Sequence, residues 1–268
     1  METADVSSGA GSDIPWFRRA CAALLMTLVA GVGSPAAQTA TPSPPSIGAV
    51  LREMPRDLWH FISWDTAAVL GVGGAAALVG HIWDDDLADE IETNVSLNDA
   101  MAPGHTYGAF SMQALIGVGM YTGGWIAKKE RLARTGGDIM RAQILSQVYV
   151  QALKYTVRRE RPDQSNNQSF PSGHSASAFA TAGVLQRHYG WKAGVPAAVV
   201  AAYVATARVH DNRHYLSDVI FGAAMGIAAE RTVTLHAGRY NVALAPGASA
   251  SGAGVIAVVH PRSSPVTQ

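Results

Sequence analysis

Apolar stretches of helical length follow one another through most of the chain, with short polar or glycine-rich breaks between them. In an up-and-down bundle, consecutive helices alternate in direction, so the end of one lies beside the start of the next. The pattern therefore predicts an all-α fold, a six-helix bundle. The six helices are expected at residues 66–83, 106–127, 138–157, 173–188, 192–209 and 215–231.

The first residues have the pattern of a secretory signal peptide. Arg18 and Arg19 precede an apolar run at 20–33, and small residues follow it at 34–37. Cys21 is the only cysteine and would be removed with this segment. No disulfide bond is therefore expected in the mature chain.

The length leaves room for one helical domain with a single core. Two short runs in the tail, 240–245 and 254–260, could pair as a short β-hairpin. The expected organisation is a signal peptide at 1–37, a linker at 38–58, the helical domain at 59–235 and the tail at 236–268.

Three short motifs fall at helix ends that the bundle would bring to one side. In the first, KYTVRRERP, Lys154 and Arg161 lie seven residues apart, about two helical turns. Both could therefore face one side of the third helix before Pro162 ends it. We expect the lysine on a rigid element and the arginine at its mouth.

The second motif, PSGH, precedes an alanine-rich helical run. A helix N-terminus has free N–H groups and a favourable dipole, and both attract an anion. Gly173 allows the backbone to approach such an anion closely, and Ser172 adds a hydroxyl donor. His174 is the last residue of the motif.

The third motif, RVHDNRHYLSD, pairs His214 with Asp218 at a spacing of four residues. On a helix, this spacing would let the carboxylate hold one imidazole nitrogen and leave the other free as a base or nucleophile. Arg208, six residues before His214, would add a second guanidinium. Together, the motifs suit a site that holds a phosphate-like oxyanion and attacks it with histidine.

The order K-x6-R-P, P-S-G-H and R-x5-H-x3-D resembles the signature of the type 2 phosphatidic acid phosphatase (PAP2) superfamily. That superfamily includes lipid phosphatases, bacterial class A acid phosphatases and vanadium-dependent haloperoxidases. The resemblance implies that Lys154, Arg161 and Arg208 bind phosphate oxygens, together with Ser172 and the Gly173 amide. It makes residues 59–235 a PAP2-type phosphatase domain.

The resemblance also implies the catalytic roles. His214 would attack phosphorus to form a phosphohistidine, and Asp218 would orient it. His174 would protonate the leaving oxygen and then activate water. Because fixed cations supply the positive charge, neither a metal nor another cofactor is expected.

Two other functions stay open on the motifs alone. A vanadium haloperoxidase could hold vanadate in the same cradle, with His214 as its ligand. A non-catalytic protein could use the cradle to bind an anionic lipid, although it would need neither His174 nor Asp218. The expected partner is a phosphorylated lipid or a small phosphoester.

Charge and hydropathy bear on location. Twenty basic and twenty acidic residues give no nucleic-acid footprint, whereas Arg158, Arg159 and Arg161 could attract an anionic substrate. Three predicted helices approach the length and apolarity of membrane spans, but the mean hydropathy is only +0.10. We expect a periplasmic protein, exported and either soluble or peripheral. The alternative is an integral inner-membrane protein whose active site faces the periplasm.

Overall fold

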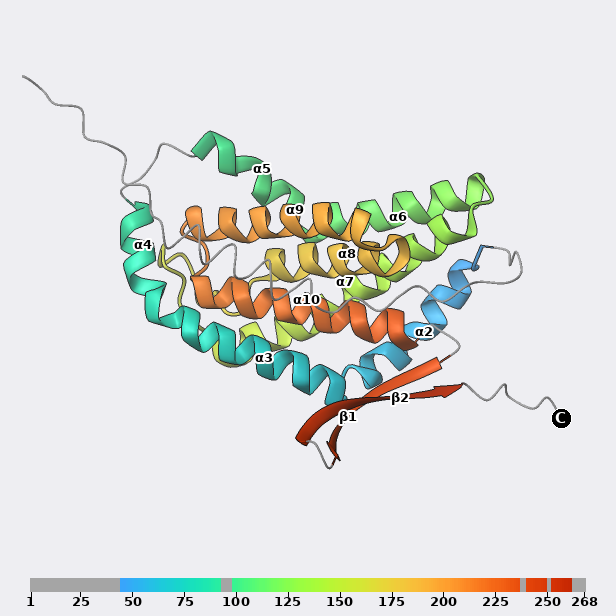
Figure 1. Cartoon of the computed structure of the whole chain (residues 1–268). Coiled ribbons are helices and arrows are strands. Elements are labelled where there is room, and N and C mark those ends of the chain that lie inside the picture. Colours follow the sequence, from blue (N-terminus) through green and yellow to red (C-terminus); the bar gives the residue numbers. More distant parts are fainter. Residues whose placement is uncertain (1–43, 93–97, 237–239, 250–251, 262–268) are drawn as a thin grey trace, which may run out of the picture. The chain divides into compact units, whose positions relative to one another are not determined.

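The computed structural model describes residues 44–92, 98–236, 240–249 and 252–261. The segment predicted to be a signal peptide, 1–37, lies outside the described residues. Nine α-helices and one 3-10 helix occur in the described part of the chain (Figure 1). They are α2 (Ile47–His60), α3 (Trp64–Gly80), η1 (His81–Trp83), α4 (Asp84–Glu92), α5 (Asn98–Gly108), α6 (Phe110–Ile126), α7 (Glu130–Val157), α8 (Gly173–Tyr189), α9 (Trp191–His210) and α10 (Leu216–His236).

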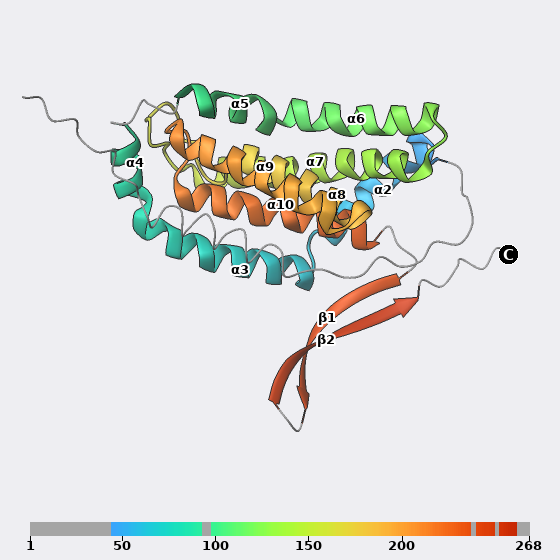
Figure 2. The ribbon, with the colours of Figure 1, turned by 45° about the horizontal axis from the view of Figure 1, so that its top comes forward.

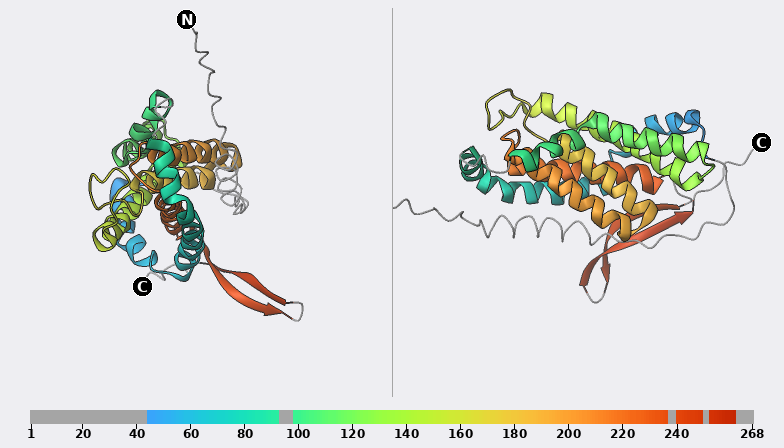
Figure 3. Two further views of the ribbon diagram at one scale, coloured as in Figure 1. Left: turned by 90° about the vertical axis from the view of Figure 1, so that its left-hand side faces the viewer. Right: turned by 90° about the horizontal axis from the view of Figure 1, so that it is seen from above.

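The predicted all-helical bundle is confirmed, and its long helices run along a common direction (Figures 2 and 3). Helix α8 packs against α7, α9 and α10, so the helix that follows the second motif is the central one. Ile139, Leu145 and Val150 of α7 meet Val184 of α8 and Met225 of α10 in the main core. Their burial is the dominant stabilising contribution at the centre of the bundle.

Glycines set the separation of α8 and α10. A Cβ at Gly222 would lie 2.4 Å from the carbonyl oxygen of Ser172, and a Cβ at Gly226 would lie 2.2 Å from that of Ala176. Larger side chains at either position would push α10 away from the start of α8. These two glycines therefore keep the second and third motifs close together.

The segment 38–58 is not simply a linker, as the sequence suggested, because it contains most of α2. The Ser46 hydroxyl caps this helix by accepting a hydrogen bond from a first-turn amide at 3.3 Å. The Asp57 carboxylate then accepts two hydrogen bonds from Arg141 of α7, each 2.7 Å long. Such a partner on a distant helix cannot be read from local sequence, and Pro55 weakens the local helical signal.

Helices α4 and α5 were not predicted, and along the chain they come between the long helices α3 and α6. Helix α5 packs against α8 and α9, and α4 begins directly after η1. In the tail, β1 (Tyr240–Ser249) pairs antiparallel with β2 (Gly252–Pro261), where the sequence suggested a hairpin.

Candidate active site

The first motif places Lys154 on a helix and Arg161 beyond it. Lys154 is buried in the last turn of α7, where its ammonium donates a hydrogen bond to the carbonyl of Gln168. The helix ends before Arg158, which adopts the left-handed backbone conformation with φ of 53°. The prediction that Lys154 and Arg161 share one helix face is therefore wrong, because Arg161 lies in the loop that follows.

The second motif begins α8 as predicted. The hydroxyl of Ser172 caps the helix by accepting a hydrogen bond from the amide of Ser175 at 3.4 Å. The first backbone bond of this helix start runs from Ala176 to Ser172 at 3.1 Å. The amides of Gly173 and His174 therefore have no helical acceptor and are available to an anion.

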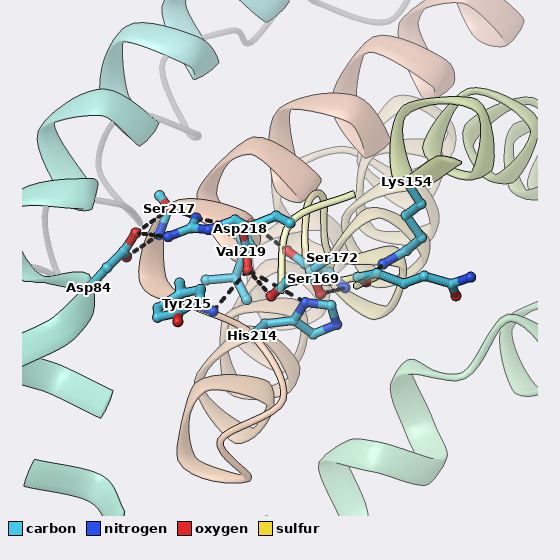
Figure 4. Close-up of polar contacts among 12 residues, drawn as sticks. Asp84, Lys154, Ser169, Ser172, His214, Tyr215, Ser217, Asp218 and Val219 are labelled. Atoms are coloured by element: carbon cyan, nitrogen blue, oxygen red, sulfur yellow. Dashed lines mark hydrogen bonds and ion pairs between the residues drawn. The ribbon is translucent and has the colours of Figure 1, made fainter. Parts of the chain in front are cut away.

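The third motif brings His214 and Asp218 together by a different route from the one predicted. His214 lies in the turn before α10 and Asp218 in its first turn, so the two do not share a helix face. They are nevertheless neighbours, with 3.8 Å between His214 Nδ1 and Asp218 Oδ2 (Figure 4). This separation exceeds hydrogen-bond length, so Asp218 acts on the imidazole as a nearby charge. Because Nδ1 lies toward Asp218, Nε2 is the nitrogen left for a phosphate.

Asp218 is held from several sides. Its side chain is fully buried and accepts hydrogen bonds from Arg159 at 2.8 Å and from the Tyr215 amide at 2.9 Å. The Ser169 hydroxyl also donates to it, and its backbone carbonyl accepts from the Ser172 amide at 3.0 Å. Arg159 therefore pairs with a buried carboxylate of the site and is not among the arginines free to attract substrate.

Several polar atoms of the predicted site are buried and lack a hydrogen-bond partner among the described residues. Such atoms are costly unless a ligand satisfies them. Arg208, buried at the end of α9, uses one guanidinium nitrogen to donate to Asp211 at 2.8 Å and leaves its Nε unpaired. The unpaired atoms of the predicted site are Arg161 Nε, Arg208 Nε, His174 Nε2 and His214 Nδ1.

The pKa values of the titratable groups show that positive charges gather here. Burial, together with the charges of Arg208 and His214, lowers the pKa of His174 to about 3. Burial likewise lowers the pKa of His214 to about 4, although Asp218 opposes the shift. Burial and the charge of Arg161 lower the pKa of Lys154 to about 8. Without an anion, the site therefore disfavours further positive charge, and both histidines are neutral at pH 7.

Within the described ranges, no group of three or more His, Cys, Asp or Glu side chains could hold a metal ion. The groups that meet at these helix ends are cationic side chains and helix amides. Such donors are complementary to a phosphate-like oxyanion.

Sequence reasoning missed several residues that surround the predicted site. Ser169 lies in the loop before PSGH, and Asp84 comes from the acidic start of α4, more than 130 positions before Ser217, which it binds. His105 of α5 places its ring centroid 5.3 Å from that of His174. No spacing rule links Asp84 or His105 to the motifs, because only the packing of α4 and α5 brings them there.

Comparison with known proteins gives relatives for part of the chain. It is 43% identical over 81 residues to the lipid A 1-phosphatase of Porphyromonas gingivalis, covering 29% of this chain and 18% of that protein. It is 34% identical over 64 residues to the lipid A 4'-phosphatase of Helicobacter pylori, covering 24% of this chain and 32% of that protein. The matches thus span less than a third of either relative's length.

A solved structure supports the fold. The crystal structure of a transmembrane PAP2 type phosphatidylglycerolphosphate phosphatase from Bacillus subtilis superposes with a TM-score of 0.54 at 22% identity. The superposition covers 64% of this chain and 94% of that chain. At this level of identity, the likeness concerns the fold alone.

Residues 138–240 match the family model of the PAP2 superfamily. This segment contains all three motifs and the four helix ends that carry them. The resemblance that the motifs indicated is thereby confirmed for this part of the chain, which is similar to the PAP2 superfamily.

Proposed function

We propose that the protein hydrolyses phosphomonoesters of lipids through a phosphohistidine intermediate. The observation that carries the proposal is a buried, neutral imidazole, His214, set beside a carboxylate and surrounded by cationic groups. Lys154, Arg161 and Arg208 would hold the non-bridging oxygens, with the Gly173 amide and the Ser172 hydroxyl completing the cradle. This arrangement would stabilise the negative charge on the phosphoryl group as it is transferred.

The reaction would proceed in two displacements. In the first, Nε2 of His214 attacks phosphorus, the bond from phosphorus to the ester oxygen breaks, and His174 gives its proton to the leaving alcohol. In the second, His174 takes a proton from water, whose oxygen attacks phosphorus, and the P–N bond breaks to release phosphate. Asp218 would stabilise the imidazole as positive charge develops on it.

His174 must be protonated for the first displacement, although its pKa is about 3 in the protein alone. A bound phosphate dianion would offset the cations that disfavour a proton on this imidazole. Substrate binding and protonation of His174 would therefore occur together. The three fixed cations would perform the electrostatic role that a metal ion has in other phosphatases.

A lipid substrate is favoured by the matched relatives and by the surface of the protein. The relatives are named for phosphatases of lipid A, a phosphorylated lipid. Helix α3 and the 3-10 helix η1 that continues it expose large apolar side chains, including Val72 (71%), Leu78 (73%) and Ile82 (71%), which a soluble protein rarely gathers on one surface. Phosphatidate, isoprenyl diphosphates and lipid A phosphates all fit the site chemistry, whereas small soluble esters do not account for this surface.

The same surface favours the integral-membrane alternative for location. Among the described residues, two helical stretches are long and apolar enough to cross a membrane, Trp64–Glu90 and Trp191–His210. From Trp64 to Trp83, the helical rise is about 28 Å, close to the ~30 Å of a bilayer's hydrocarbon core. Both tryptophans are exposed, as expected of residues at the two interfaces.

The distribution of charge supports one orientation in the membrane. Lys128, Lys129, Arg131 and Arg134 lie around the start of α7, at the end of the bundle opposite Lys154. Positive residues favour the cytoplasmic side, so the active site would face the periplasm. This placement agrees with one of the two locations that the sequence left open.

The proposal is tested with the full chain in detergent or vesicles. We expect it to release phosphate from phosphatidate, lipid A phosphate or an isoprenyl diphosphate, and to form an acid-labile phosphoenzyme when quenched during turnover. His214→Ala should abolish both signals, whereas His188→Ala, in the last turn of α8 away from the site, should retain both. Phosphoenzyme in His214→Ala, or no release from any of these substrates, would refute the proposal.

A further inference from the structure

Arg159, which is partly buried, and the fully buried Asp84 form an ion pair directly behind the candidate active site. Arg159 Nη2 lies 2.9 Å from Asp84 Oδ2, while its Nη1 lies 2.8 Å from Asp218 Oδ1. The same Nη1 donates to the Ser217 hydroxyl at 2.7 Å. One guanidinium thus joins the carboxylate beside His214 to a second carboxylate on α4.

This arginine is fixed by its surroundings. Its guanidinium carbon lies 4.0 Å from the centre of the Tyr215 ring, so the planar group stacks on an aromatic face. Asp84 is fully buried and also accepts hydrogen bonds from the Ser217 amide, at 2.9 Å, and hydroxyl. His81 Nδ1 lies 2.8 Å from the same carboxylate. Both oxygens of Asp84 are therefore occupied by protein donors.

The contacts leave Arg159 poorly placed to hold substrate. Both of its terminal nitrogens are already engaged by the carboxylates of Asp84 and Asp218. Arg161 and Arg208 differ, since each keeps a buried guanidinium nitrogen without a partner. The three arginines thus divide into two that face the anion site and one that faces its supporting carboxylate.

We infer that Arg159 and Asp84 are positioning residues, which fix the Asp218 carboxylate and through it the orientation and charge of His214. This inference rests on the proposed function, because it assigns the pair to the same reaction. At 3.8 Å, Asp218 makes no hydrogen bond to His214, so its position beside the imidazole depends on the groups that hold the carboxylate, and Arg159 is the charged one among its hydrogen-bond partners. A fixed carboxylate close to the imidazole stabilises the charge that forms on attack.

The electrostatics of Asp218 agree with this role. Burial alone would raise its pKa, but the nearness of His214 and the charge of Arg159 bring it below the ordinary value. Lys154 on α7 and Arg161 in the following loop also face this carboxylate. Removing Arg159 should therefore raise the pKa of Asp218, so that activity is lost at a higher pH on the acid side.

The test compares Arg159→Ala, Arg159→Lys, Asp84→Asn and the control Arg134→Ala. The control removes an arginine that pairs with Glu130 at the far end of α7. Arg159→Ala should lower kcat about 10- to 100-fold with little change in KM, the range in which contacting residues couple. Its acid limb in kcat/KM should move to higher pH. Arg159→Lys should return the low-pH side of the kcat/KM profile to its wild-type position but recover only part of kcat. Lysine keeps the positive charge but lacks the two terminal guanidinium nitrogens that bind two carboxylates at once.

A double-mutant cycle separates positioning from simple stability. Removing Arg159 in an Asp218→Asn background should cost less than about 3-fold, because the carboxylate on which it acts is already gone. An equal loss in both backgrounds, with an unmoved acid limb, would show that the arginine only stabilises the fold. Wild-type kcat in both Arg159→Ala and Asp84→Asn would overturn the inference. In that case, loss of activity in His214→Ala would still support the proposed function.

Discussion

Anion binding should carry a proton into the site, and sulfate is the probe that isolates this effect. Sulfate resembles a phosphate dianion but does not itself titrate near neutral pH. Without an anion, the pKa of His174 is about 3, because burial and the charge of Arg208 disfavour its charged form. A bound dianion reverses this balance, so sulfate should bind more tightly as pH falls.

The magnitude follows from the two protonation states. At pH 5.5, a group with a pKa near 3 carries less than about 0.01 proton. If the anion returns the pKa of His174 to at least its ordinary value of about 6.5, it carries about 0.9 proton. The expected uptake is therefore close to one proton per sulfate. By linkage, the affinity for sulfate should fall about eightfold for each unit of pH around 5.5.

Titration calorimetry in two buffers with different ionisation enthalpies measures this uptake directly. His174→Asn should reduce it to nearly zero, whereas His188→Asn, in the last turn of α8, should leave it unchanged. Uptake below about 0.2 proton in the unsubstituted chain would refute the coupling between anion and imidazole. Equal uptake in His174→Asn would assign the proton to another group.

Four further outcomes are expected. His174→Ala should lose about 10²- to 10⁴-fold in turnover of alkyl phosphates but far less with p-nitrophenyl phosphate, whose leaving oxygen scarcely needs a proton; equal losses on both would contradict its role as the acid. Turnover should survive excess EDTA, and loss that a divalent ion restores would contradict a metal-independent mechanism. The full chain should leave membranes only in detergent, and release by mild washing in a fractionation experiment would instead favour the soluble or peripheral form. Gly222→Ala should destabilise the fold by about 1–3 kcal/mol in denaturant unfolding, since its Cβ would lie 2.4 Å from the Ser172 carbonyl, whereas Gly119→Ala, with open space around it, should not.

The sequence predicted the bundle well because long helices carry a strong local signal. The motifs were also placed correctly at helix ends, and the alanine-rich run after PSGH marks one such end locally. Helix α7, however, ends at Val157, well before Pro162. Geometry within the motifs was harder to predict. His214 and Asp218 were expected on one helix face, yet α10 begins at Leu216, so a turn brings them together.

The ion pairs behind the site could not be predicted from the sequence. Asp84 and Arg159 are 75 positions apart, and each sits in a run of like charges that is usually solvated. Only the packing of α4 against the start of α10 selects one member of each run for this ion pair. The ion pair between Asp57 of α2 and Arg141 of α7 could likewise not be predicted from the sequence. Contacts between side chains on different helices cannot be predicted from local sequence patterns alone.

Under the proposed function, the two groups of arginines would explain how one site holds both an anion and a carboxylate. An unpaired Asp218 would repel phosphate and offset part of the attraction from Lys154, Arg161 and Arg208. Arg159 lies against this carboxylate on the side of Asp84, so its charge balances Asp218 without occupying the cradle. Asp218 can then remain ionised beside His214 while the three cradle cations keep their net attraction for a dianion.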